Sequence, residues 1–128
     1  MEGDELEQVR RIALALPGVT ERTSHGEPCF FVQGTRPLCY FHDDHRGDGR
    51  ISLWCPAPSG VPADLTASEP DRFFHPTPSA SGVFATWLGV YLDAGGDDCV
   101  DWAEIAGIVE DAFRTVAPKA LIDELDHR

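Results

Sequence analysis

The chain of 128 residues has no long apolar run and no targeting pattern at its start. A membrane-spanning helix needs roughly 20 consecutive apolar residues, and no stretch approaches that length. The first four residues, Met1 to Asp4, are acidic and lead straight into a helical pattern, the opposite of a secretory or transit signal. We therefore expect neither a membrane protein nor a secreted one, but a cytoplasmic protein.

Cysteine is scarce, and no two of the four residues have C-x-x-C spacing: Cys29, Cys39, Cys55 and Cys99. The spacing argues against structural zinc, and a disulfide framework fits neither the chain length nor the cytoplasm. Most of these residues lie in apolar runs, where a free thiol behaves as a small hydrophobic residue. A hairpin turning near Gly34 would bring Cys29 and Cys39 opposite each other, and we expect both to be reduced.

Positive charge is also scarce, since 22 acidic residues stand against 10 basic ones and the formal net charge is −12. A field of this sign repels a polyanion, so we do not expect binding to generic duplex DNA. The acidic surface is better explained as a means of keeping the protein soluble. Specific DNA binding would need a contiguous cationic face, drawn from Arg10, Arg11, Arg22, Arg36, Arg46 and Arg50.

The apolar share of 42% is sufficient for the core of one domain, residues 1–128. Amphipathic spacing predicts helices over residues 4–16, 61–67, 101–116 and 118–125. Asp101 can cap the start of the third helix, with Glu104 three positions later. The apolar face of that helix, which we expect to be buried, carries Trp102, Ile105, Val109 and Phe113.

The middle of the chain is rich in β-forming residues. Strands are predicted over residues 28–33, 37–42, 50–55 and 84–92, and the polar segment 19–27 is predicted to be a loop. Because several of these strands follow one another as hairpins, we predict an α+β fold: a mainly antiparallel sheet with the amphipathic helices packed on it.

Alternate residues along the predicted strands form two sets, one for each face of the sheet, and both sets contain large side chains. One apolar set comprises Phe30, Val32, Leu38, Tyr40, Ile51, Leu53, Leu88, Val90 and Leu92. Phe31, Trp54, Trp87 and Tyr91 have the alternate parity, so they should share the second face of the sheet. Either that face is covered too, or it displays aromatic side chains, and large exposed aromatic patches usually mark contacts. A symmetric homodimer would cover such a patch, and we expect its interface to contain Phe31, Trp87 and Tyr91.

The residues that could carry chemistry form no established catalytic or metal motif. Residues 42–45 with Asp48 place metal-capable groups in one turn, but a solvated hairpin loop explains them better, and we expect no metal. Ser59 lacks the glycines of a nucleophile elbow, and Cys55 has no cationic neighbour in sequence. No glycine-rich loop opens a helix, so we expect no nucleotide cofactor and no catalytic residue.

Three other residues are candidates for ligand binding: His25, Trp54 and Lys119. Each type can recognise an anion or a planar group, and a lysine at a helix start opposes the helix dipole, which favours a specific reason for its presence. The structural alternatives are a loop histidine bonded to the backbone, a core tryptophan and a surface charge. The choice between these alternatives stays open at this point.

Segments along nearly the whole chain resemble the MmcQ/YjbR family. They include Leu-Pro-Gly-Val-Thr-Glu at 16–21, His-Gly-Glu-Pro-Cys-Phe at 25–30, Asp-Arg-Phe-Phe at 71–74 and Trp-Leu-Gly-Val at 87–90. The resemblance implies a YjbR-like α+β fold, similar to secretion-chaperone-like and double-wing-like folds. Our leading hypothesis is a non-catalytic binding or regulatory domain. The alternatives are DNA binding, as the family name implies, and a small-molecule-binding protein or enzyme with a pocket near His25 and Lys119.

Overall fold

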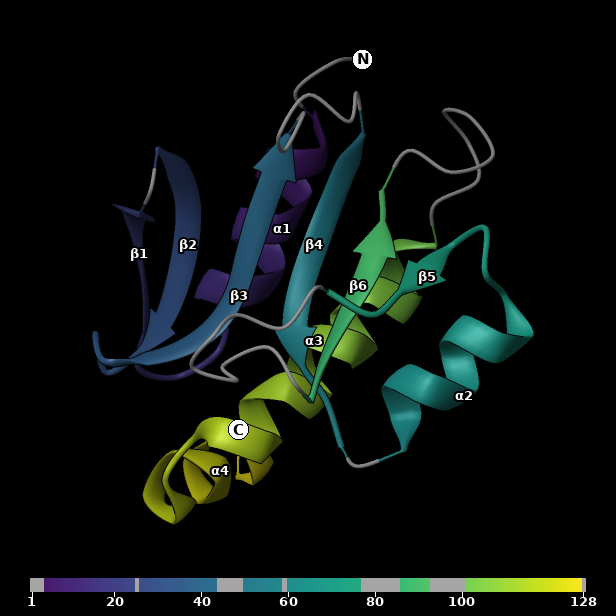
Figure 1. The fold of residues 1–128 in the computed structure, drawn as a ribbon. Helices are drawn as coiled ribbons and strands as arrows, with labels where there is room; N and C mark the ends of the chain where they lie inside the picture. The colour runs from purple at the N-terminus through teal and green to yellow at the C-terminus, as the bar shows by residue number, and fades with distance from the viewer. Residues whose placement is uncertain are drawn as a thin grey trace.

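In the described part of the chain, six antiparallel strands form one sheet, in the order β1-β2-β3-β4-β6-β5. The computed structural model describes residues 4–24, 26–43, 50–58, 60–76, 86–92 and 101–127. Figure 1 shows their elements: α1 Asp4–Leu14, β1 Val19–Ser24, β2 Glu27–Val32, β3 Arg36–Asp43, β4 Ile51–Pro56, α2 Val61–Ser68, β5 Phe73–Phe74, β6 Trp87–Tyr91, α3 Trp102–Val116 and α4 Lys119–Asp126. The predicted α+β class is confirmed.

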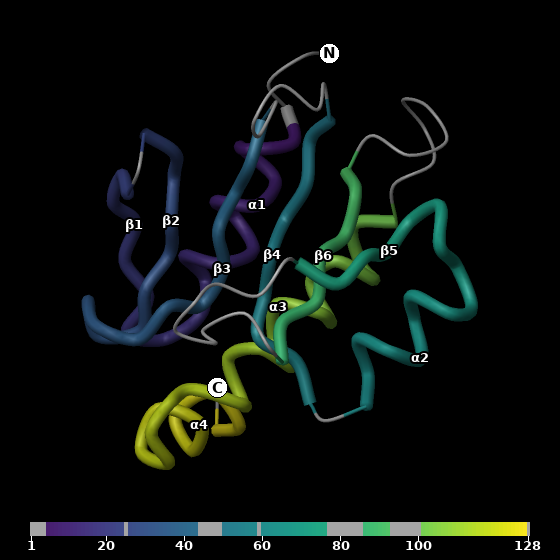
Figure 2. Tube along the Cα trace, in the orientation of Figure 1, coloured from purple at the N-terminus to yellow at the C-terminus, as the bar shows by residue number. Residues whose placement is uncertain are grey.

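The helices lie on one side of the sheet and at its ends. In Figures 1 and 2, α1 and α3 run behind the strands, and α4 lies below them. Helix α1 contacts α3 and β1, α3 contacts β3 and β4, and α2 packs against β5 and β6 at the sheet edge. Leu121 of α4 packs against Gly18 in the turn between α1 and β1. The described helices therefore leave the opposite face of the sheet without a helical layer.

The hydrophobic core fills the space between the sheet and the two long helices. Its fully buried side chains include Val9 from α1, Phe30, Leu38, Leu53 and Val90 from the strands, and Ile105, Val109 and Phe113 from α3. The side chain of Asp101 accepts hydrogen bonds from the N–H groups of Ala103 (3.0 Å) and Glu104 (3.2 Å), which confirms the predicted cap. Of the four residues expected to be buried on α3, only Trp102 is half-buried instead.

The prediction of a loop over residues 19–27 is wrong, because Val19–Ser24 forms the edge strand β1. Its side chains show no apolar alternation, which is why the sequence did not indicate a strand. The strand forms through its backbone pairing with β2, and polar residues such as Glu21 and Arg22 suit an edge that faces water. The first helix also ends at Leu14, two residues earlier than expected.

A β-bulge in β3 overturns a second prediction, the side on which Tyr40 lies. Phe30 pairs with Cys39 but Phe31 pairs with Pro37, so Leu38 is the extra residue of β3. Leu38 and Cys39 therefore both reach the core, and Tyr40 turns to the opposite face, away from Leu38. The same bulge places Cys29 opposite Tyr40 rather than opposite Cys39. Cys29, Cys39 and Cys55 are free thiols.

Phe113→Ala should lower the free energy of unfolding by about 3–5 kcal/mol, because it removes a fully buried ring from the core. Urea denaturation followed by circular dichroism measures this loss. Leu14→Ala is the control, since Leu14 is 45% exposed and its truncation should change stability by less than about 1 kcal/mol. A Phe113→Ala loss below about 0.5 kcal/mol would contradict the packing of α3.

Candidate functional site

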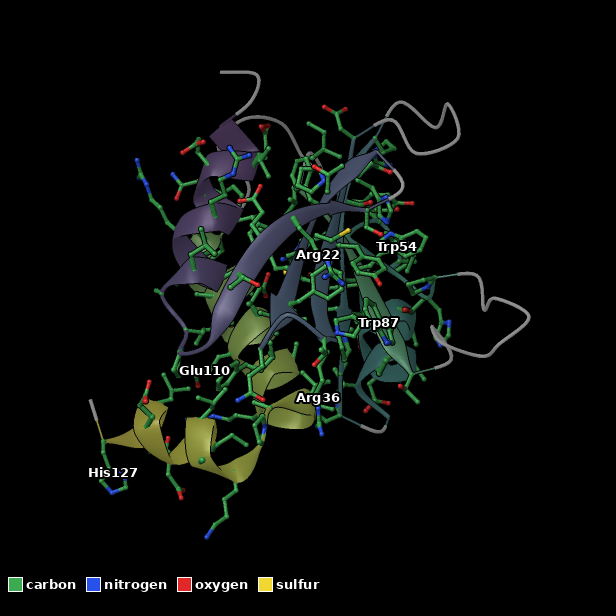
Figure 3. All side chains as sticks on the ribbon, turned by 90° about the vertical axis from the view of Figure 1, so that its left-hand side faces the viewer. Arg22, Arg36, Trp54, Trp87, Glu110 and His127 are labelled. Atoms are coloured by element: carbon green, nitrogen blue, oxygen red, sulfur yellow. The ribbon has the colours of Figure 1, made fainter. Side chains whose placement is uncertain are left out.

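The sheet face turned away from α1 and α3 carries most of the aromatic side chains of the strands. Trp54 and Trp87 project from this side in Figure 3, opposite the helices. The predicted sharing of one face by Phe31, Trp54, Trp87 and Tyr91 is confirmed by the strand register and by the absence of all four from the core cluster. We call this surface the aromatic face, and it comprises Phe31, Tyr40, His42, Trp54, Phe74, Trp87 and Tyr91.

A single row of cross-strand neighbours runs across the aromatic face from one edge of the sheet to the other. Directly opposed pairs connect the following residues in order: Arg22, Cys29, Tyr40, Trp54, Gly89 and Phe74. Opposed residues in an antiparallel pair point to the same face, so this row is a continuous surface feature. At a strand spacing of about 4.8 Å, the row is roughly 24 Å long.

The rings of the aromatic face contact one another rather than standing apart. Tyr40 and Trp87 have ring centroids 5.2 Å apart, and the Phe31 ring lies 6.3 Å from that of Tyr40. Trp54 lies 6.2 Å from Phe74, which lies 4.7 Å from Tyr91. These separations are typical of stabilising aromatic pairs, so the rings hold one another in place before any ligand arrives.

The rings of the aromatic face differ in how far solvent reaches them. Phe31 and Trp87 are each 5% exposed, whereas Tyr40, Trp54, Phe74 and Tyr91 are half-buried. Phe31 and Trp87 thus have little surface left to give to a second subunit. The homodimer expected over Phe31, Trp87 and Tyr91 stays a prediction, and sedimentation velocity of the chain measures it directly.

Two guanidinium groups stack on rings at separate places on the aromatic face. The Cζ atom of Arg22 lies 4.0 Å from the centroid of the Phe31 ring, and that of Arg50 lies 3.7 Å from the centroid of Tyr91. Arg22 is exposed, and no carboxylate of the described residues lies within 4.0 Å of its guanidinium. The stacked geometry leaves the N–H groups of a guanidinium, at its rim, able to meet an anion.

Glu27 is the one carboxylate that the register of the described strands places on the aromatic face, and its oxygens are engaged. Its Oε1 lies 2.8 Å from Nδ1 of His42, and its Oε2 accepts a hydrogen bond of 3.0 Å from the N–H of Asp43. His42 in turn lies against Trp54, with ring centroids 4.2 Å apart. This contact packs the imidazole of His42 against the Trp54 ring. On the neighbouring strand position, burial raises the pKa of the Tyr40 phenol, so the phenol stays protonated.

Gly89 allows Phe74 to join the aromatic face. A Cβ atom added at Gly89 would lie 2.3 Å from the ring of Phe74, closer than any real contact. The Phe74 ring therefore lies directly over the backbone of β6, where it bridges Trp54 and Tyr91. Glycine is required here because a strand position with a side chain would push the ring away.

The structure separates the three residues proposed for ligand binding. Trp54 lies at the centre of the aromatic face. Lys119 is exposed at the start of α4, and Figure 3 shows that helix below the sheet on the side of α1. His25 lies outside the described residues, as does most of the loop considered for a cation, residues 44–49. The described part of the chain contains no group of three or more metal-capable side chains.

Sequence reasoning did not place Tyr40, His42 or Phe74 on this site, and it named Arg22 and Arg50 only as candidates for a DNA-binding cationic face. Tyr40 was assigned to the wrong face because a bulge leaves no clear sequence signal. Arg22 belongs to the strand that was predicted as a loop, and the contact of Arg50 with Tyr91 depends on the pairing of β4 with β6. Two sequence features could have indicated Phe74: the Phe73-Phe74 pair itself, and the glycine of the Trp-Leu-Gly segment with which it pairs in the sheet.

Gly89→Ala should lower the free energy of unfolding by about 1–3 kcal/mol, because the new methyl group overlaps the Phe74 ring. In a Phe74→Ala background the same change should cost much less, and urea denaturation of the four proteins of this double-mutant cycle gives the coupling. Gly107→Ala is the control: its Cβ would meet no atom within 4 Å, and alanine favours a helix. Equal losses in both backgrounds would show that Phe74 does not require Gly89.

Comparisons with known proteins agree with this fold. The chain is similar to protein DR2400 of Deinococcus radiodurans, whose crystal structure carries the domain DUF419, with a TM-score of 0.66. The two chains are 17% identical, and the match covers 94% of this chain and 87% of the other. No curated protein matches the chain. The family model YjbR matches residues 14–115, most of the chain, and the protein therefore belongs to the YjbR family.

Proposed function

We propose that this YjbR domain is a non-catalytic binding domain and that the aromatic face is its binding surface. The observation that supports the proposal is the row of cross-strand neighbours with the half-buried rings of Tyr40, Trp54 and Phe74, on a sheet face that the described helices do not cover. The guanidiniums of Arg22 and Arg50 stack on rings of the same face. Half-buried rings offer apolar area, and guanidiniums offer hydrogen bonds to an anion. The ligand that fits both is one with planar rings and negative charge.

The charge distribution supports this choice of surface. On the helical side, Arg10 donates a hydrogen bond of 2.9 Å to Glu21, and Arg114 donates one of 2.6 Å to Asp126. Arg72, which stacks on the core side chain Phe73, is bonded to Glu69 and Glu104. These arginines are therefore already engaged with carboxylates, whereas the register of the described strands places a single carboxylate, that of Glu27, on the aromatic face.

A catalytic role for the aromatic face has less support. Cys29 is the cysteine in the row of cross-strand neighbours; it is 3% exposed, and burial raises the pKa of its thiol. Its Sγ lies 3.6 Å from the carbonyl oxygen of Glu27, to which the thiol donates a hydrogen bond. A thiol held in the neutral form is a poor nucleophile, because the thiolate is the reactive species.

The proposed function predicts that a planar aromatic anion binds the folded protein. With 8-anilinonaphthalene-1-sulfonate as the probe, we expect a saturable rise in its fluorescence. Trp54→Leu and Arg22→Gln should each weaken its binding by about two- to tenfold, the value of one ring or cation contact. Arg11→Gln is the matched control, since Arg11 is exposed on α1, on the other side of the sheet, and its loss should leave binding unchanged.

The fold of each variant must be intact for this test, because partly unfolded proteins also bind the probe. Urea denaturation and near-ultraviolet circular dichroism establish that. Equal affinity in the parent and in both site variants would remove the aromatic face as the binding surface. No fluorescence change in the parent would remove the proposed function.

Generic duplex DNA should not bind appreciably near 0.15 M salt. Nonspecific binders reach dissociation constants of roughly 10⁻⁴ to 10⁻⁶ M by neutralising many phosphates, and here three of the arginines are paired with carboxylates. Fluorescence anisotropy with a labelled 20-base-pair duplex measures this, and a pool selection covers a sequence-specific site. Micromolar affinity with a steep dependence on salt would contradict the prediction and favour the alternative, DNA binding.

A further inference from the structure

We propose that the ligand of the aromatic face is a single-stranded nucleic acid, bound with its bases on the central rings and its phosphates at Arg22 and Arg50. This inference depends on the proposed function, because it names the class of ligand for the same surface. The argument uses the separation of the two cations, the rings between them and the charge of the face.

The two guanidiniums are too far apart for one small anion. Arg22 belongs to β1, while Arg50 directly precedes β4 and stacks on Tyr91 of β6. In the sheet order, β1 and β4 are separated by three strand spacings, about 14 Å. A single carboxylate or phosphate can meet one guanidinium, but a chain with an anion at every repeat can meet both. The spacing therefore favours a polyanion in an extended form.

The residues between the cations favour a polyanion that carries planar rings. Tyr40 and Trp54 stand opposite each other between the edge strand and β6, and Phe74 continues the row beyond Gly89. Bases stack on aromatic side chains irrespective of sequence, and antiparallel sheets that display such rings are a recurring means of binding single strands. An acidic peptide supplies the charge without a ring at each repeat, and a duplex keeps its base faces stacked inside.

The number of cations sets the expected salt dependence. For a single strand, the slope of log K against log salt is about −0.7 for each phosphate neutralised, so two contacts give a slope of about −1.4. This value is much smaller than that of proteins that bind through a basic patch. The net charge of −12 and a small slope are therefore compatible with binding through stacking.

Fluorescence anisotropy with labelled dT12 and rU12 tests the inference, and the two strands distinguish DNA from RNA as the source. We expect saturable binding of at least one strand at protein concentrations up to about 10⁻⁴ M, with a salt slope near −1.4. Trp54→Leu should weaken binding about five- to 150-fold, the range measured for one stacked base, and Trp54→Tyr should recover most of it. Arg22→Gln should reduce the salt slope by about 0.7, and Arg11→Gln should leave it unchanged.

Competition identifies the surface and separates the two proposals. The probe 8-anilinonaphthalene-1-sulfonate should be displaced by dT12 or rU12, but not by poly-glutamate of the same length. Displacement by poly-glutamate as effective as that by either strand would overturn the nucleic-acid inference in favour of an acidic chain. Binding of the probe without binding of either strand would also overturn it, while leaving the proposed function intact. Failure of the probe and of both strands would overturn both proposals.

Discussion

Alternation along the strands places large side chains on both faces of this sheet, and α1 and α3 cover only one of them. Side chains at successive positions of a strand point to opposite faces, so a strand such as Ile51–Pro56 sends Leu53 into the core and Trp54 to the other side. Burying the first set stabilises the fold. The second set has no cover from the described helices, and Tyr40, Trp54, Phe74 and Tyr91 stay half-buried, which is the physical basis for regarding that face as a binding surface.

Two local features turn this second face into an ordered surface. The bulge at Leu38 moves Tyr40 out of the core and into line with Cys29 and Trp54, so that the row of neighbours crosses the sheet without a gap. Gly89 removes one side chain from the row, and the ring of Phe74 occupies the space. Both features favour rings held in fixed positions.

The fold class, the helices and the face shared by Trp54, Trp87 and Tyr91 could be predicted from the sequence, because they depend on periodicity alone. The site as a whole could not. Tyr40 depends on a bulge, Arg22 on an edge strand that forms through its partner, and Phe74 on a glycine in another strand. Each of these is set by pairing between strands, and pairing register has no signature within a single segment. Family membership adds the fold and names no ligand.

The three tryptophans allow the most direct measurement of the account, because Trp54 and Trp87 lie on the aromatic face while Trp102 lies on α3, against the core. The indole N–H signals of the three side chains can be followed in one nitrogen-15 correlation spectrum as dT12 or rU12 is added. We predict that the signals of Trp54 and Trp87 shift with saturation at a common dissociation constant, while that of Trp102 stays in place. A shift confined to Trp102, or no shift at any of the three, would contradict binding at the aromatic face.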